Sequence, residues 1–337
     1  MRSSTAPAPA LKPDSAEPRA SLIAPSGIDP SGAVDFDAVA KALNAAGHGP
    51  GQEAGLMARF CRPVAVRVMA DHAAAVAASL IALGVRPGGY CVVPALASAE
   101  TLAGIALAGL KPWLVDVDPF SWMFDPAHLR ERLPEAPGPL EAILPIGAHG
   151  RAPDLRAWAA FRDEVGLPIL VEAVEAFDVI QSAPVPVIVG LPSGQGVFIA
   201  CEDAIPVAAI EAPMFEGEAG LELWPRKRPR LATAAQRLRV LLLDAPIGFQ
   251  LGWGMSWISD VCALSVPNDT ASAVLARLAR AGVEAGGVCV GARFAATDDT
   301  PVADRLAGSV VVVRIDPDLD IAGLDDLAAA LRSAVAG

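Results

Sequence analysis

A glycine-rich stretch, GLPSGQGVFIACED at residues 190–203, holds the residue types of three different kinds of site. Its glycines around Ser193 could cradle a phosphate, present a nucleophilic serine, or turn the chain between two strands. A phosphate-binding P-loop ends in Gly-Lys-Ser/Thr, whereas residues 195–197 are Gln-Gly-Val. A nucleophilic serine elbow needs glycine two residues before the serine, where this chain has Leu191. We therefore predict a turn whose glycines serve chain reversal and close packing.

The residues before this turn alternate between helix-like and strand-like patterns. Apolar residues recur at helical spacing in some segments, and short apolar or β-branched runs lie between them. We expect helices at 71–85, 99–110, 125–133 and 154–165, and strands at 90–95, 111–118, 141–147 and 168–174. Strands that alternate with helices pair in parallel through right-handed crossovers. The fold class is therefore α/β, with a three-layer α/β/α large domain around a mostly parallel sheet.

This alternation stops after the glycine-rich turn. Residues 204–256 look irregular and contain several prolines, and from residue 257 the pattern is strand, helix, strand, strand, helix. We expect a flexible tail at 1–30, a large domain at 31–256 and a smaller α+β domain at 257–337.

Composition excludes several classes of protein. The chain has 337 residues, 53% of them hydrophobic, with a net charge of −12, which disfavours a nucleic-acid partner. We find no uninterrupted apolar run long enough for a membrane span, and no secretory signal in the Pro-rich start. The five cysteines lack the spacing of metal ligands, so we expect no metal and a cytoplasmic protein.

Three long blocks of the sequence resemble a known enzyme family. They begin with ALGVRPGGYCVV, AILPIGAHGRAPD and TPVADRLAGSVVVV, and together they are similar to the DegT/DnrJ/StrS nucleotide-sugar aminotransferases over roughly residues 60–337. The resemblance implies a fold-type-I enzyme that uses pyridoxal phosphate (PLP). Such an enzyme takes four contributions from the protein.

Two of these contributions are a lysine for the Schiff base and a carboxylate for the pyridine nitrogen. The resemblance places the lysine near Ser193, but the four lysines of the chain, Lys12, Lys41, Lys111 and Lys227, all lie elsewhere. The matching strand end, LVEAVEAF, has Glu172 followed by alanine at position 173, Ala173, where the family has aspartate. Consecutive strand residues face opposite ways, so Glu172 does not replace it.

The other two contributions are a phosphate cradle and a stacking aromatic ring. The family's Ser-Gly-Thr turn corresponds to Asp71, His72 and Ala73, where an aspartate caps the helix and repels an anion. His72 could compensate, although a histidine in a first helical turn is more often a surface or cap residue. The aromatic position corresponds to Ser98. With all four contributions missing, we expect no cofactor and no catalytic residue.

Four further side chains could contact a ligand in the remaining cleft. His149 and Arg151 match a region that lines the substrate side of the cleft in the family, and Glu172 and Glu175 follow a strand end. The alternative is that the histidine is exposed to water and that both glutamates are solvated or paired at the strand's carboxyl end.

The resemblance leaves more than one function open. We expect a degenerate homologue that is non-catalytic with respect to PLP and acts as a binding, scaffold or regulatory protein in a sugar or surface-polysaccharide pathway. It would form a homodimer and bind an active paralogue or a sugar nucleotide. The alternative is a functional PLP-dependent aminotransferase with an atypical site. A PLP-independent enzyme that uses His149, Glu172 or Glu175 as acid or base is a third possibility.

Overall fold

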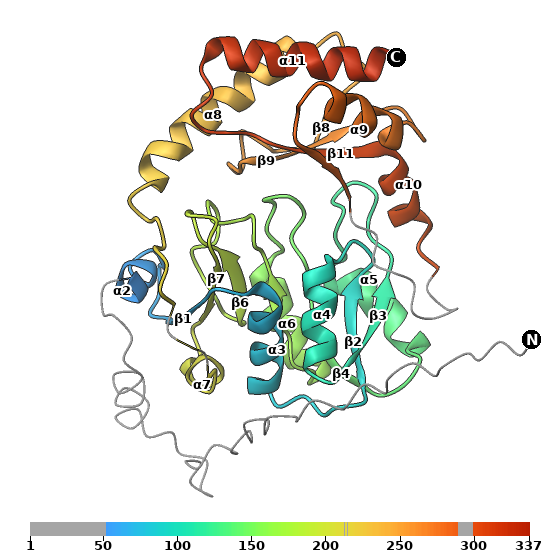
Figure 1. The fold of residues 1–337 in the computed structure, drawn as a ribbon. Coiled ribbons are helices and arrows are strands. Elements are labelled where there is room, and N and C mark those ends of the chain that lie inside the picture. Colours follow the sequence, from blue (N-terminus) through green and yellow to red (C-terminus); the bar gives the residue numbers. More distant parts are fainter. Residues whose placement is uncertain (1–51, 212, 214, 289–298) are drawn as a thin grey trace, which may run out of the picture. The chain divides into compact units, whose positions relative to one another are not determined.

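The computed structural model describes residues 52–211, 213, 215–288 and 299–337 (Figure 1). All of the described residues belong to one compact unit. The tail expected at 1–30, Lys12 and Lys41 lie outside the described residues. Among the described residues, no helix is both long enough and apolar enough to cross a membrane.

A mostly parallel sheet forms the centre of the N-terminal part. Its strands are β1 (Ala65–Met69), β2 (Tyr90–Pro94), β3 (Lys111–Val115), β4 (Leu140–Ile143), β5 (Val171–Glu172), β6 (Val187–Gly190) and β7 (Val197–Cys201). Strand β2 pairs in parallel with β3 and β4, and β5 with β6, while β7 runs antiparallel between β6 and β1. The parallel bridges Ile143–Ile169 and Ile146–Glu172 join the two groups of strands. The predicted α/β class is confirmed.

Helices cover both faces of this sheet (Figure 1). One layer holds α3 (His72–Ala82), α4 (Ala99–Leu107) and α7 (Ala204–Ala208); the other holds α2 (Gln52–Met57), α5 (Pro126–Arg132) and α6 (Leu155–Val165), with the 3-10 turn η1 (Leu133–Glu135) after α5. Successive side chains of β1 point to opposite faces of the sheet, which explains why both faces need a layer of helices. Val66 and Val68 pack in the core on the α6 side, whereas Ala65 and Met69 pack against α3. Three layers result.

Short polar caps begin the helices that carry the candidate site. Asp71 accepts a hydrogen bond of 2.6 Å from the backbone amide of Ala74 at the start of α3, and Ser98 caps α4. Asp125 caps α5 with Pro126 in its first turn, as the sequence predicts. Helices α3 and α4 approach closely at Gly104.

The C-terminal part has an antiparallel sheet with most of its helices on one face. Its elements are α8 (Trp224–Leu241), β8 (Gly248–Phe249), β9 (Val261–Ser265), α9 (Ala271–Arg280), β10 (Ala285–Gly287), α10 (Pro301–Ser309), β11 (Val310–Arg314) and α11 (Ile321–Ala336). The strand order is β10-β11-β9-β8. Helices α8, α9 and α11 share one core with Trp253 and Trp257.

Helix α8 differs from the sequence-based expectation of an irregular segment at 204–256. It is an 18-residue helix with Pro225 in its first turn, a position that lacks an intrahelical partner anyway, and with Pro229 inside it. Because Leu231 and Leu238 bury against α9 and α11, tertiary packing outweighs the poor local propensity. This core includes residues on both sides of position 257, and the domain limits given above stay a prediction.

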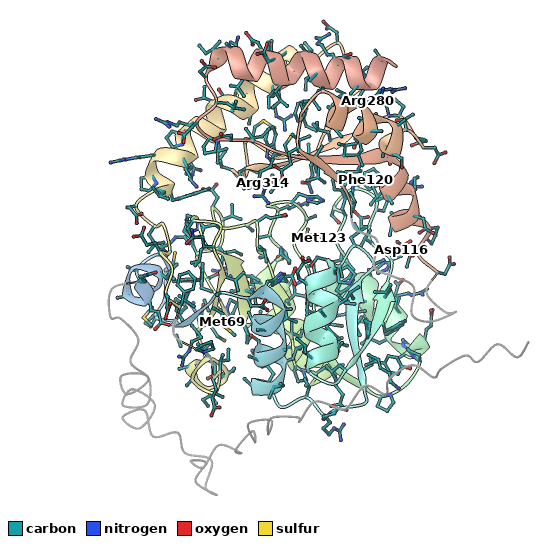
Figure 2. The ribbon with its side chains drawn as sticks, viewed as in Figure 1. Met69, Asp116, Phe120, Met123, Arg280 and Arg314 are labelled. Carbon is teal, nitrogen blue, oxygen red and sulfur yellow. The ribbon has the colours of Figure 1, made fainter. Side chains whose placement is uncertain are left out.

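The two sheets are joined at their facing sides. Asp116, labelled in Figure 2, follows β3 and accepts hydrogen bonds from the backbone amides of Val302 and Ala303 at 2.8 and 2.9 Å. It therefore caps α10 from the other sheet. Trp122 and Ala148 share a small apolar cluster with Val310 of β11. These contacts hold the C-terminal sheet over the carboxyl ends of the parallel strands.

Candidate functional site

A cavity of about 670 Å³ lies where the parallel strands of the N-terminal sheet end. His72 begins α3, Ser98 precedes α4 and Glu172 ends β5, and all three line it. His149 and Glu175 enter from the following loops, and Arg314 from β11. In open α/β sheets, ligands bind at this edge. Five residues that the sequence singled out therefore meet in one cavity.

Glu172 is the most buried charged group of this cavity, at 5% exposure. Its Oε2 accepts a hydrogen bond of 2.8 Å from Thr101 Oγ1, which lies 2.9 Å from Ser98 Oγ, and His72 Nε2 is 3.3 Å away. Burial opposes the charged form of His72, but the neighbouring Glu172 carboxylate outweighs it and raises the pKa of His72. The His72 imidazole therefore keeps its proton to a higher pH than a free histidine does.

His149 and Glu175 form a second histidine–glutamate pair, in which burial favours the uncharged form of both side chains. His149 Nδ1 lies 3.7 Å from Glu175 Oε2. Burial lowers the pKa of His149 to about 4. Burial also raises the pKa of Glu175 to about 7, with smaller influences from Arg314, Asp260 and Glu172. Between these values the imidazole is neutral and the carboxyl is protonated.

Trp122, like Arg314, is a cavity residue that the sequence analysis missed. Its ring lies edge-on to that of His149, with centroids 6.1 Å apart, and both residues adopt left-handed backbone conformations, with φ of 61° and 49°. Such conformations are uncommon outside glycine and gather at functional sites. Trp122 follows β3, not β2, so a search for an aromatic residue near Ser98 could not find it.

The loop that carries His149 is fixed from the C-terminal part. Gln250, at 3% exposure, donates from Nε2 to the backbone oxygen of Ala148 over 3.1 Å. Gly150, with φ of 90°, packs so closely on Ser259 that a Cβ there would lie 2.6 Å from the Ser259 Cβ. The tertiary structure therefore determines where His149 points.

The other predicted site residues lie outside this cavity. Arg151 lines a different pocket, together with Asp154 and Trp158. Asp71 is an exposed helix cap, and Ala173 is buried at 2% exposure. Ala73 is half-buried in the first turn of α3. Of the two candidate contacts on this loop, His149 lines the cavity and Arg151 lines the other pocket, and a ligand contact by either residue stays a prediction.

Ser193 lies in the predicted turn, away from the cavity lining. The backbone amide of Gly194 donates to Leu191 over 2.9 Å, and the strands β6 and β7 pair on either side. A Cβ at Gly196, where φ is 158°, would lie 2.5 Å from the Met69 backbone oxygen. Close approach, not ligand binding, accounts for this glycine.

Neither lysine among the described residues lines the cavity. Lys227 Nζ donates to the backbone oxygen of Pro192 over 3.0 Å and ties α8 to the turn. Lys111 lies at the start of β3, with its ammonium 5.6 Å from the ring centre of Tyr90.

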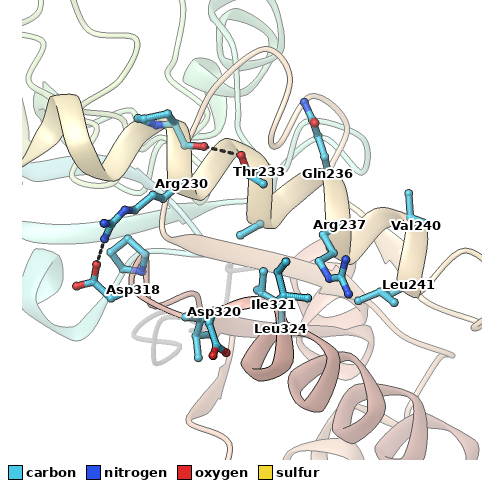
Figure 3. Close-up of a pocket in the computed structure, with 14 residues that line it drawn as sticks. Arg230, Thr233, Gln236, Arg237, Val240, Leu241, Asp318, Asp320, Ile321 and Leu324 are labelled. Carbon is cyan, nitrogen blue, oxygen red and sulfur yellow. Dashed lines mark hydrogen bonds and ion pairs between the residues drawn. The ribbon is translucent and has the colours of Figure 1, made fainter.

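A wide groove of about 810 Å³ between α8 and the start of α11 is a second hollow of the described surface (Figure 3). Ion pairs such as Arg230–Asp318 line it, and the Thr233 hydroxyl donates a hydrogen bond to the backbone oxygen of Pro229 within α8. Its exposed Val240 and Ile321 make it partly apolar. The cavity at Glu172 brings together His72, His149 and Glu175, whose pKa values are shifted, and is therefore the better candidate site.

Comparison with known proteins supports the family resemblance. Residues 53–182, less than half of the chain, match the DegT/DnrJ/EryC1/StrS aminotransferase family. A UDP-2-acetamido-2-deoxy-3-oxo-D-glucuronate aminotransferase from Pseudomonas aeruginosa is 32% identical over 97 residues. A pleiotropic regulatory protein from Geobacillus stearothermophilus is 35% identical over 98 residues. Each alignment covers 29% of this chain and 26% of the relative.

Solved structures share the fold over most of the chain. A DegT DnrJ EryC1 StrS aminotransferase from Brucella abortus superposes with a TM-score of 0.67 at 19% identity, covering 89% of this chain and 95% of that one. The ntda structure from Bacillus subtilis, which holds bound PMP, gives 0.68 at 15% identity, over 90% and 83%. At these identities the likeness establishes the fold.

These comparisons correct the expectation that no cofactor is involved. That expectation is wrong, because the matched family is an aminotransferase family and a neighbour of the same fold binds PMP. The residues of the cavity nevertheless fit covalent attachment of such a group poorly. Its described lining has no lysine, and the Asp71 carboxylate already holds the Ala74 amide at the start of α3. Residues 53–182 are thus similar to the DegT/DnrJ/EryC1/StrS aminotransferase family, and the chain shares the fold of the solved aminotransferase from Brucella abortus.

Proposed function

We propose that this protein keeps the fold and cavity of a sugar aminotransferase but does not transaminate through a lysine-bound cofactor. It acts instead as a binding or regulatory protein whose cavity holds a small ligand, in a sugar or surface-polysaccharide pathway. Noncovalent binding of a pyridoxal cofactor is compatible with this role. The observation that carries the proposal is the absence of a lysine from the described lining of the cavity.

The positions of the two described lysines support this role. A Schiff base needs an amine within bonding distance of the cofactor aldehyde. Lys227 is engaged at Pro192, in a turn that contributes no residue to the described cavity lining, and Lys111 lies at the opposite, amino-terminal end of its strand. Segment 289–298 contains no lysine either. The name of the regulatory relative from Geobacillus stearothermophilus is consistent with a non-enzymatic function on this sequence type.

Borohydride reduction tests this proposal directly. The full-length protein is incubated with PLP, reduced and digested, and modified lysines are located by mass spectrometry. We expect only slow, non-saturating labelling, equal in the protein and in its Lys111→Arg variant. Saturable labelling of one lysine, abolished by Lys227→Arg and accompanied by transamination, would favour an aminotransferase with an atypical site.

Assembly is the second part of the proposal. Phe120, Leu251 and Met255 expose 84%, 80% and 67% of their surface. Exposed large apolar side chains on loops are typical of surfaces that associate. We propose that the protein pairs through these loops, as a homodimer or with an active paralogue.

A cytoplasmic location belongs to the same proposal. Cys61, Cys91, Cys201 and Cys262 are free thiols, and Cys61 is exposed. An exposed free thiol is typical of a reducing compartment.

A further inference from the structure

The charges that line the cavity are mostly negative. Four glutamates reach it, from α4, from the end of β5, from the loop after it and from the residue before β10: Glu100, Glu172, Glu175 and Glu284. The described lining has one guanidinium, that of Arg314. A lining that is mainly negative raises the local concentration of cations.

The positive groups of the cavity are already compensated or uncharged. Arg314 Nη1 donates to Asp260 Oδ2 over 2.7 Å, so its charge is paired. His72 faces Glu172 at 3.3 Å. His149 is neutral at physiological pH, because burial lowers its pKa to about 4.

Glu175 therefore lacks a cation of its own. Its nearest basic group is the neutral imidazole of His149, at 3.7 Å, and the raised pKa of Glu175 shows that burial costs its charged form free energy. Arg314 stabilises that charge in part, whereas Asp260 and Glu172 oppose it. A ligand that brings a positive charge would offset this cost.

An aromatic ring lies beside the same imidazole. Trp122 is 7% exposed, lines the cavity and contacts His149 edge-on. Tryptophan attracts cations through the face of its ring more strongly than other aromatic residues do. His149 thus has the carboxylate of Glu175 and the indole of Trp122 as neighbours. A carboxylate and an indole together recognise ammonium groups.

We propose that this cavity binds a small organic molecule with a protonated primary amine, which Glu175 holds by charge and Trp122 by its ring. The inference rests on the proposed function in requiring that the cavity take a ligand, and it adds the chemical class of that ligand.

Matched small probes test the charge preference. Ethanolamine, ethylene glycol and glycolate are similar in size but cationic, neutral and anionic, and a UDP-sugar serves as a large anionic probe. Binding to the full-length protein is followed by saturation-transfer NMR and calorimetry. We expect saturable binding of ethanolamine and at least tenfold weaker binding of the others. Equal or tighter binding of a neutral or anionic probe would overturn the proposal.

Variants locate the amine within the protein. Glu175→Gln should weaken ethanolamine binding at least tenfold, while Glu131→Gln, an exposed glutamate on α5, should leave it unchanged. Trp122→Leu should weaken it and Trp122→Phe should retain part of it, with circular dichroism confirming that each variant is folded. Unchanged affinity in Glu175→Gln would exclude the assigned site.

The pH dependence of ethanolamine affinity tests the role of Glu175 separately from the proposed function of the protein. Ethanolamine keeps its charge between pH 6 and 8, so its affinity should rise as Glu175 ionises, and this rise should disappear in Glu175→Gln. His72, whose pKa is raised, is present in both proteins, so its titration cancels in the comparison. Transamination through a labelled lysine would refute the proposed function, whereas loss of charge selectivity would refute only the ammonium site.

Discussion

His72 Nε2 lies 3.3 Å from Glu172 Oε2, and this contact links the start of α3 to the end of β5 across the mouth of the cavity. Thr101 from α4 donates to the same oxygen, so three elements converge on one buried carboxylate. This carboxylate is costly to replace, because His72 loses the opposite charge beside it and Thr101 loses its charged acceptor.

Glu172→Gln should therefore lower both stability and the pKa of His72. We expect a loss of about 1–3 kcal/mol in the free energy of unfolding, measured in urea. The pKa of His72 is raised in the folded protein, so the stability it contributes is present below its unfolded pKa and is lost as pH rises through the folded pKa. NMR titration of His72 checks the direction, and an unchanged pKa would contradict the assigned pair.

Glu175→Gln should stabilise the protein at alkaline pH. Because burial raises the pKa of Glu175 to about 7, the carboxyl favours folding below its unfolded pKa and this advantage is lost as pH rises through 7. Glutamine removes the charge, and we expect a gain of about 1 kcal/mol at pH 8 relative to pH 5, since partial exposure screens the effect. His149 is common to both proteins and cancels in the comparison. A stability difference that is independent of pH would contradict this account.

Gly104→Leu should disrupt the contact between α3 and α4. A Cβ at this position would lie 2.6 Å from the Val76 Cβ and 2.7 Å from the Ala73 backbone oxygen. Neither group can move without shifting α3, so we expect a loss of about 3 kcal/mol in thermal or urea unfolding. Ala106→Leu, at an exposed position of the same helix, is the control and should be nearly neutral.

Ser193→Lys should not restore covalent attachment of PLP. The backbone amide of Ser193 donates to Ala219 over 3.2 Å, and its side chain packs on Gly220, so a new amine would begin in the turn and not in the cavity. Borohydride reduction followed by peptide mapping measures the result. Saturable labelling of position 193 would show that the turn does reach the cofactor position.

Substitution of the exposed loop should produce a monomer. The chain has a mass of 34.5 kDa, and we expect light scattering to give about twice that for the unmodified protein. The double variant Leu251→Glu and Met255→Glu should dissociate, because buried charges destabilise an apolar interface. Val240→Glu, exposed on α8, is the control. A monomeric unmodified protein at micromolar concentration would contradict the homodimer.

Local chemistry in the sequence determined the elements and several of their limits. Asp125 and Pro126 predicted the start of α5, because a cap and a fixed φ act within one turn. The apolar alternation before Ser193 predicted the layered α/β sheet, and the parallel order placed Glu172 at its ligand-binding edge. The absence of a lysine near Ser193 was also visible in the sequence alone.

Only the tertiary structure decided which side chains share the cavity. Trp122 lines the cavity from the loop after β3, whereas Arg151 lines another pocket. The course of these loops depends on long-range contacts, such as the hydrogen bond of Gln250 with Ala148, 102 positions away in the chain. Helix α8 exists because its apolar face is buried, although its prolines argue against it locally. Burial likewise lowers the pKa of His149 and raises that of Glu175. The spacing of residues along the chain does not encode this burial.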